Sequence, residues 1–201
     1  MNTIAIISQK GGAGKTTLAI HLAVAATHIG MNAAVIDLDP QASSTKWADR
    51  RHTELPVVIS AHASRLPHVL ETARVTGGDL AIIDTAPHSD NAALEAARAA
   101  DFILVPCRPS ILDLEAIANS LDIARLAKKP ATVVLNAVAP SGTEADEAAE
   151  AIAQLGGEAC PIRLVNRVSF ARSIVYGQSA QEYDPDGKAA QEIDALHKFI
   201  C

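Results

Sequence analysis

The sequence predicts an α/β fold, with one doubly wound, mostly parallel sheet and helices on both of its faces. Short β-branched runs alternate with helix-length segments along all 201 residues, an order typical of βαβ units. Runs such as Ile82-Ile83 and Val133-Val134-Leu135 are apolar throughout, which is typical of strands buried on both faces. A chain of this length is expected to form a single domain spanning residues 1–201.

The expected elements follow one another along the chain. Strands are predicted at residues 3–8, 33–37, 57–60, 80–84, 102–105 and 131–136, with a further candidate at 161–165. Helices are predicted near residues 15–30, 63–75, 90–99, 112–127, 144–155 and 187–200. Glycine and proline fall where strands give way to helices, so they indicate turns rather than linkers between domains.

The composition excludes several classes of protein. The chain carries 17 Lys and Arg against 23 Asp and Glu, a formal charge of −6, so nucleic acid or anionic lipid could bind only a local basic patch. Three widely spaced cysteines, Cys107, Cys160 and Cys201, indicate neither a disulfide framework nor a zinc or iron–sulfur site. Neither a signal peptide nor a membrane span is expected, and a reduced, cytoplasmic location fits.

The clearest chemistry lies between the first strand and the first helix. The strand Ile4-Ala5-Ile6-Ile7 leads into the string KGGAGKTT, residues 10–17, and a helix follows. This order is the context of a phosphate-binding loop, whose backbone N–H groups surround an anion. Lys15 is expected to neutralise phosphate oxygens, and the Thr16 hydroxyl to bind Mg²⁺. The predicted nucleotide-binding residues of the loop are Lys10, Gly11, Gly12, Ala13, Gly14, Lys15, Thr16 and Thr17.

A second lysine distinguishes this loop. Lys10 lies five residues before Lys15, and with it the loop resembles the deviant Walker A motif of the ParA/MinD superfamily of ATPases. The resemblance implies that ATP and Mg²⁺ are the cofactors. It also implies that Lys10, like Lys15, is catalytic and reaches across an ATP-dependent sandwich dimer to the partner's nucleotide. The alternative for Lys10 is an ordinary solvated charge.

Two carboxylates follow the second predicted strand. Asp37 and Asp39 share one side of the chain at the carboxyl edge of the sheet, where open α/β folds bind ligands. The string DLDPQ, residues 37–41, is similar to switch I of the ParA/MinD family. The resemblance implies that Asp39 positions or activates the attacking water and that Asp37 supports the metal shell. A helix-capping and turn pair is the alternative.

Another carboxylate ends the fourth predicted strand. Asp84 follows the apolar residues 80–83, and the segment through Pro87 resembles a Walker B strand with its switch II turn. An acid at this position can hold Mg²⁺ directly or through water, because Mg²⁺ keeps several waters and recruits few protein carboxylates. A strand-ending aspartate can also simply cap the next helix.

A side-chain amide ends the strand predicted at residues 131–136. Asn136 can both donate and accept hydrogen bonds and so recognise a base. The ParA/MinD family often places an asparagine here and holds adenine with the stretch after a later strand. The resemblance therefore implies an adenine site at Asn136, Pro161 and Ile162, and a turn-forming asparagine is the alternative.

Basic residues gather late in the chain. Residues 159–181 contain arginines and no acid, and the segment is similar in order to the late ParA region with its EYDP string, here residues 182–185. The candidate DNA-contacting residues are Arg163, Arg167 and Arg172, together with the pair Lys128 and Lys129 at a helix end. They could contact phosphates non-specifically, and each could equally belong to a solvated face.

The resemblance covers nearly the whole chain and is strongest to small, stand-alone ParA-type partition ATPases. It implies an ATP-bound homodimer that binds DNA non-specifically, associates with the nucleoid, and hydrolyses ATP weakly until a ParB-type adaptor protein stimulates it. One alternative is a MinD-like membrane ATPase, but residues 187–201 form a net-neutral amphipathic segment that suits docking on the core. Another is a metabolic enzyme of the dethiobiotin synthetase type, which Lys10 and the DLDPQ segment disfavour.

Overall fold

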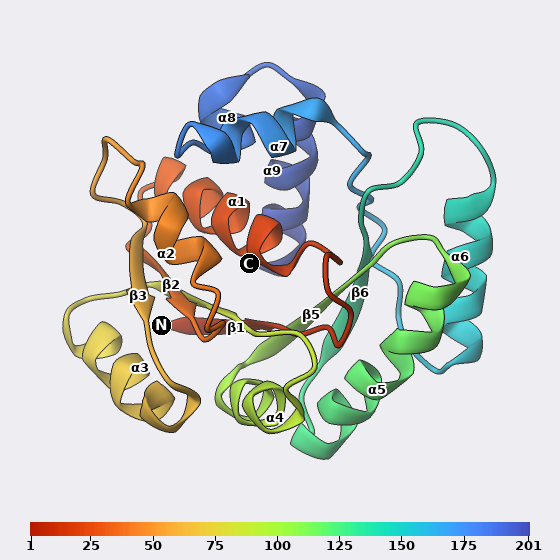
Figure 1. The fold of residues 1–201 in the computed structure, drawn as a ribbon, viewed down its shortest axis with the longest axis horizontal. Helices are drawn as coiled ribbons and strands as arrows, with labels where there is room; N and C mark the ends of the chain where they lie inside the picture. The colour runs from red at the N-terminus through yellow and green to blue at the C-terminus, as the bar shows by residue number, and fades with distance from the viewer.

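The computed structural model describes all 201 residues, and a central sheet organises them (Figure 1). Its strands are β1 (Asn2–Ile6), β2 (Ala33–Asp37), β3 (Val57–Ser60), β4 (Leu80–Asp84), β5 (Phe102–Cys107) and β6 (Ala131–Leu135). The strand order is β3-β2-β4-β1-β5-β6, and every adjacent pair is parallel. The predicted doubly wound parallel sheet is therefore confirmed, and all the carboxyl ends of the strands lie at one edge.

The helices cover both faces of this sheet (Figure 1). They are α1 (Lys15–His28), α2 (Ser43–Ala48), α3 (Leu66–Val75, after a 3₁₀ turn at Ala63–Arg65), α4 (Asp90–Ala99), α5 (Ile111–Ala127), α6 (Glu144–Gln154), α7 (Val168–Val175), α8 (Ala180–Tyr183) and α9 (Lys188–Ile200). The six helices expected from the sequence are present. The short helices α2, α7 and α8 were not expected.

Alternating strand residues supply two separate cores. Ile4, Ile82 and Val134 pack with α1 and α9 on one face, whereas their neighbours Ile83 and Val133 pack with α3 to α6 on the other. This alternation explains why the strands are apolar along their whole length. The apolar residues of α9 lie in the first of these cores, which confirms that the last helix docks on the body of the protein. None of the helices is long and apolar enough to cross a membrane.

Residues 161–165 do not form the additional strand that the sequence suggested. The chain passes beside β6 with only two isolated bridges, at Ala159 and Val165. Between them Pro161 has no N–H to donate, so the ladder is interrupted and resumes where Leu164 N donates to Leu135 O at 2.9 Å. The second bridge pairs Val165 with Val138, just past the carboxyl end of β6.

Candidate active site

A cavity of about 460 Å³ opens at the carboxyl edge of the sheet, above the loop that joins β1 to α1. The segments around it come from both halves of the chain. Its lining includes Gly12, Gly14, Lys15, Thr16, Thr17, Asp39, Gln41, Arg108, Asn136, Val165, Asn166, Arg167 and Phe170. The structure thus brings the predicted loop, the switch I aspartate and Asn136 together at one site.

The loop leaves no room for a side chain at Gly14. This residue has φ +104°, and a Cβ built on it would lie 2.1 Å from Nδ2 of Asn136. Asn136 Nδ2 in turn donates a hydrogen bond of 2.8 Å to the carbonyl of Ala13. Asn136, predicted as a base-recognising residue, therefore also holds the loop in shape from the end of β6.

Lys15 is buried beneath the loop and is held by carbonyl groups. Its Nζ donates to Ser8 O at 2.9 Å and to Lys10 O at 3.2 Å. Burial lowers the pKa of Lys15, and the charges of Asp84 and Asp39 oppose this effect. Since no carboxylate is paired directly with the ammonium group, its charge is available to an anion in the cavity.

Asp84 combines burial with an unused oxygen. Ser44 Oγ donates to its Oδ2 at 2.8 Å, whereas Oδ1 is buried and has no hydrogen-bond partner. Burial raises the pKa of Asp84 to about 6, and the nearby hydroxyls of Thr16 and Ser44 oppose the rise. An orphaned carboxylate oxygen beside the loop threonine suits Mg²⁺, which keeps several waters. No cluster of three or more His, Cys, Asp or Glu residues could hold a metal ion by itself.

The two switch I aspartates differ in role. Asp37 Oδ2 accepts hydrogen bonds from the N–H and hydroxyl of Thr45 at 3.0 and 3.1 Å, and Oδ1 accepts from Asp39 N at 3.1 Å. Asp37 therefore caps α2, the helix that carries Ser44, as the alternative for this residue had it; its support of a metal shell stays a prediction. Asp39 is half-buried and lines the cavity.

Lys10 lies apart from the cavity of its own chain. Its side chain lines a separate hollow formed with Gln9, His88, Asp90, Ala116 and Asn119. Its backbone carbonyl already accepts a hydrogen bond from Lys15. The two lysines of the loop thus line different hollows: Lys15 lines the cavity, and Lys10 lines the hollow beside α4 and α5.

Pro161 and Ile162 do not line the cavity. Pro161 is exposed beside β6, and Ile162 packs against the core under α1 and α9. The part of this segment that reaches the cavity is Val165 to Arg167, since the chain arrives at the carboxyl edge only there. Asn136, Val165, Asn166 and Arg167 line the cavity, whereas the predicted adenine residues Pro161 and Ile162 do not.

The candidate DNA-contacting residues do not form one face. Arg163 pairs with Asp146 and Arg167 with Glu192, each at 2.6 Å. Lys128 and Lys129 follow α5 just before β6, at the opposite edge of the sheet from α7 (Figure 1). Of the five residues, Arg172 on α7 is the one exposed arginine without an ion pair.

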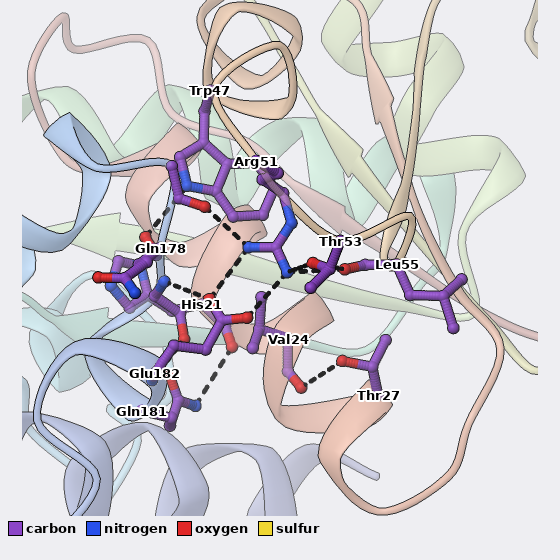
Figure 2. Close-up of polar contacts among 12 residues, drawn as sticks. His21, Val24, Thr27, Trp47, Arg51, Thr53, Leu55, Gln178, Gln181 and Glu182 are labelled. Atoms are coloured by element: carbon purple, nitrogen blue, oxygen red, sulfur yellow. Dashed lines mark hydrogen bonds and ion pairs between the residues drawn. The ribbon is translucent and has the colours of Figure 1, made fainter.

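A polar network ties α2 and the residues that follow it to the C-terminal helices (Figure 2). Trp47 Nε1 donates to Gln178 O at 3.0 Å, and the guanidinium of Arg51 lies 4.4 Å from the Trp47 ring centroid. Arg51 also forms two hydrogen bonds with Glu182, at 2.8 and 3.0 Å, and one with Gly177 O at 2.9 Å. These residues were not expected to act together, because they are far apart in the sequence and carry no local pattern.

A parallel α/β sheet with a glycine-rich loop, a buried lysine and an aspartate at the end of β4 defines a P-loop nucleoside triphosphatase. Residues 4–180 match the family model described as the CobQ/CobB/MinD/ParA nucleotide binding domain, and the chain belongs to this family. It is accordingly an ATPase that uses ATP and Mg²⁺.

Individual relatives agree with this assignment. Maintenance of carboxysome distribution protein A of Gloeobacter kilaueensis is 33% identical, over 98% of this chain and 91% of the relative. Protein ParA of Rhizobium radiobacter is also 33% identical, but the match covers 61% of this chain and 56% of the relative. Among solved structures, the septum site-determining protein MinD with Mg-ADP from Pyrococcus horikoshii has a TM-score of 0.81 at 17% identity, covering 99% and 95% of the two chains.

Proposed function

We propose that this protein is an ATP-driven positioning ATPase. Binding of Mg-ATP joins two copies face to face, and the dimer binds DNA non-specifically. An adaptor protein on the cargo, in the role of ParB, stimulates an otherwise weak hydrolysis and so releases the dimer. Repeated cycles move or space the cargo, and the ATP-bound form associates with the nucleoid.

The position of Lys10 carries this proposal. Its side chain lines a hollow outside the cavity that contains Lys15 and Thr16. A loop lysine directed away from its own phosphate site can bind the phosphates of a second copy. The same edge of the molecule exposes Ile111 and Leu112, 74% and 62% accessible, at the start of α5. Adjacent exposed apolar residues are typical of surfaces that another protein covers.

The relatives bear on the identity of the cargo. The relative named for carboxysome distribution matches this chain over nearly its full length, whereas the ParA match covers 61% of it. A large protein assembly is therefore the favoured cargo, and a plasmid or chromosome region is the second candidate. In both cases DNA would be the surface on which the dimer assembles.

We assign the steps of hydrolysis to particular residues of the cavity. Lys15 binds phosphate oxygens, and Thr16 and Asp84 would hold Mg²⁺, which supplies positive charge to the phosphates when bound. Asp39 lines the same cavity and would orient the attacking water. Asn136 keeps the loop in the shape that these contacts require.

The proposal is tested by measuring molecular mass and DNA retention with ATP, with ADP and without nucleotide, across a salt series. Only ATP should produce a dimer that retains DNA, and retention should fall as the salt concentration rises because non-specific binding depends on contacts between cations and phosphates. Equal mass and retention with ATP and ADP would overturn the proposal.

Three variants separate the steps. Lys15→Ala should abolish nucleotide binding. Lys10→Ala should bind ATP and remain monomeric, and Asp39→Ala should form an ATP dimer that hydrolyses slowly.

Liposome flotation with ATP distinguishes this protein from a membrane-positioning ATPase, and co-flotation would favour that alternative.

A further inference from the structure

Arg108 stands at the carboxyl end of β5, in a short turn that leads into α5. Its backbone carbonyl accepts a hydrogen bond of 2.8 Å from Ser110 N, and the Ser110 hydroxyl accepts from Asp113 N to cap α5. The intervening Pro109 restricts the turn further. Arg108 is therefore held at the same edge of the sheet as Asp39, Asp84 and Asn136.

The side chain of Arg108 reaches the phosphate-binding loop. It lines the cavity that contains Lys15 and Thr16, and its Nη2 lies 3.5 Å from the position a Cβ would take on Gly12. Gly12 belongs to the part of the loop that precedes the N-terminus of α1. Lys15, in contrast, is held beneath the loop by Ser8 and Lys10. The two cations thus approach the loop at different places.

The guanidinium of Arg108 makes no hydrogen bond or ion pair with the protein. Most other arginines have a partner: Arg51, Arg74, Arg98, Arg125, Arg163 and Arg167 form ion pairs, and Arg50 donates to a carbonyl. Arg65 and Arg172 are also free, but neither lines the cavity. Arg108 is therefore the one arginine that combines an unused guanidinium with a position over the loop.

We propose that Arg108 binds the terminal phosphate of the ATP held by its own chain. A guanidinium presents a planar set of donors that matches phosphate oxygens, and charge-assisted bonds of this kind are among the strong ones. Arg108 shares the cavity with Asp39, the residue proposed to orient the attacking water, so it would act at the phosphate that reacts. The inference rests on ATP binding by this family and on no step of dimerisation or DNA binding.

The consequence is discrimination between ATP and ADP. The two nucleotides differ by the terminal phosphate, so Arg108→Ala should weaken binding of a slowly hydrolysed ATP analogue by about 10- to 100-fold, the loss typical of a charge-assisted hydrogen bond. Binding of Mg-ADP should change by less than about twofold. Arg108→Lys keeps the charge without the planar fork, so its affinity for the ATP analogue should lie between that of wild type and that of Arg108→Ala.

The experiment measures the dissociation constants of Mg-ADP and of the ATP analogue by calorimetry, so its readout is binding and not turnover. Arg65→Ala is the matched control, because Arg65 is exposed and free but lies outside the cavity. Unchanged affinity for the analogue, or an equal loss of both nucleotides, would overturn the proposal. Circular dichroism melting checks that each variant is folded.

A second set of measurements tests whether Arg108 contacts the nucleotide of its own chain or that of a partner chain. The measurements are repeated in Lys10→Ala, with light scattering used to select conditions in which the protein is monomeric. A contact within one chain predicts the same loss of analogue binding there. A loss that occurs only in dimers would assign Arg108 to the partner's nucleotide and overturn the assignment. If ATP produces no dimer in any variant, the proposed positioning function fails while this inference stays testable on the monomer.

Discussion

Gly14 shows how a single residue controls the loop. Its φ of +104° is a backbone conformation that glycine adopts and that other residues rarely do, and an added Cβ would lie 2.1 Å from Asn136 Nδ2. Gly14→Ala should displace Asn136 from Ala13, lower nucleotide affinity by about tenfold or more, and reduce the free energy of unfolding by about 1–3 kcal/mol. Nucleotide titration and urea unfolding measure the two effects.

Gly11→Ala is the matched control for this prediction. Gly11 lies in the same loop, but a Cβ there would meet no atom within 4 Å and its φ is not positive. This substitution should leave folding nearly unchanged. If Gly14→Ala bound nucleotide as tightly as Gly11→Ala, the close packing of Asn136 on the loop would not contribute to nucleotide affinity.

Site residues could be predicted where a local pattern carries them. Lys15 and Thr16 follow from the loop sequence, and Asp84 and Asn136 follow from polar residues that end apolar strands. Arg108 ends a strand in the same way, in the string Val105-Pro106-Cys107-Arg108, so this rule could have found it. The sequence did not indicate that Pro161 and Ile162 lie outside the cavity, because the path of that segment depends on its tertiary contacts beside β6.

At the scale of elements, local patterning predicted the long helices and missed the short ones. Helices α3 to α6 repeat apolar residues over enough turns to show a period, whereas α2 has six residues and α8 has four. Tertiary contacts stabilise α2, through its cap at Asp37 and through Trp47, which is fully buried. Neither contact can be read from the neighbouring sequence.

The ion pair between Arg51, three residues after α2, and Glu182 of α8 links these two helices (Figure 2). The Arg51 side chain is 4% exposed and that of Glu182 is 21% exposed. Burial favours the neutral form of Glu182, but hydrogen bonds from Arg51 and from Ser179 N outweigh it, so the pKa of Glu182 lies below its ordinary value. The pair therefore remains charged in a largely water-excluded place.

Removing one member of this pair should be costly. Arg51→Ala is expected to lower the free energy of unfolding by about 2–4 kcal/mol, because it leaves the Glu182 carboxylate without its partner and removes the contact with Trp47. Glu182→Ala should cost less on top of Arg51→Ala than alone, with a coupling of about 1 kcal/mol or more. Urea unfolding of the single and double variants measures this coupling.

The exposed pair of Arg74 and Glu71 supplies the comparison. Both side chains are more than half exposed, and the residues are three apart on α3. Arg74→Ala should therefore change stability by less than about 0.5 kcal/mol. Strictly additive effects of Arg51→Ala and Glu182→Ala would show that the link between α2 and α8 adds nothing beyond its separate side chains.

At the scale of the whole molecule, the distribution of charge differs from its sequence average. The arginines of residues 159–181 are free of acids in sequence, yet Asp146 and Glu192 approach Arg163 and Arg167 from other elements. A run of like charges in the sequence therefore does not by itself predict a charged surface patch. The sheet and its two cores, in contrast, could be predicted because alternating apolar strands are a local property.

The stability of the whole fold also depends on a buried histidine at the junction of three elements. His21 on α1 is completely buried, and its ring lies edge-on to Phe170 of α7 with centroids 5.2 Å apart. Its Nδ1 lies 2.7 Å from Thr17 O and must donate, because a carbonyl only accepts. Gln181 of α8 donates to the backbone carbonyl of His21 at 3.4 Å (Figure 2).

Burial lowers the pKa of His21 to about 4, although the Thr17 carbonyl and the charge of Glu182 oppose the shift. Below about pH 6.5 the unfolded chain takes up a proton at this residue that the folded chain does not, so the free energy of unfolding falls as the pH falls toward 4. The full effect is about 3 kcal/mol at 1.36 kcal/mol per pKa unit. Asp84 acts in the opposite sense below pH 6, since its raised pKa makes the folded chain bind the proton first.

The test is therefore the difference in stability between wild type and His21→Gln, from urea unfolding between pH 4 and 7.5, in which the Asp84 contribution cancels. Wild type should lose about 3 kcal/mol relative to the variant as the pH falls. His68→Gln on the surface of α3 controls for loss of a histidine, and a difference that stays constant with pH would show that His21 binds its proton equally in both states.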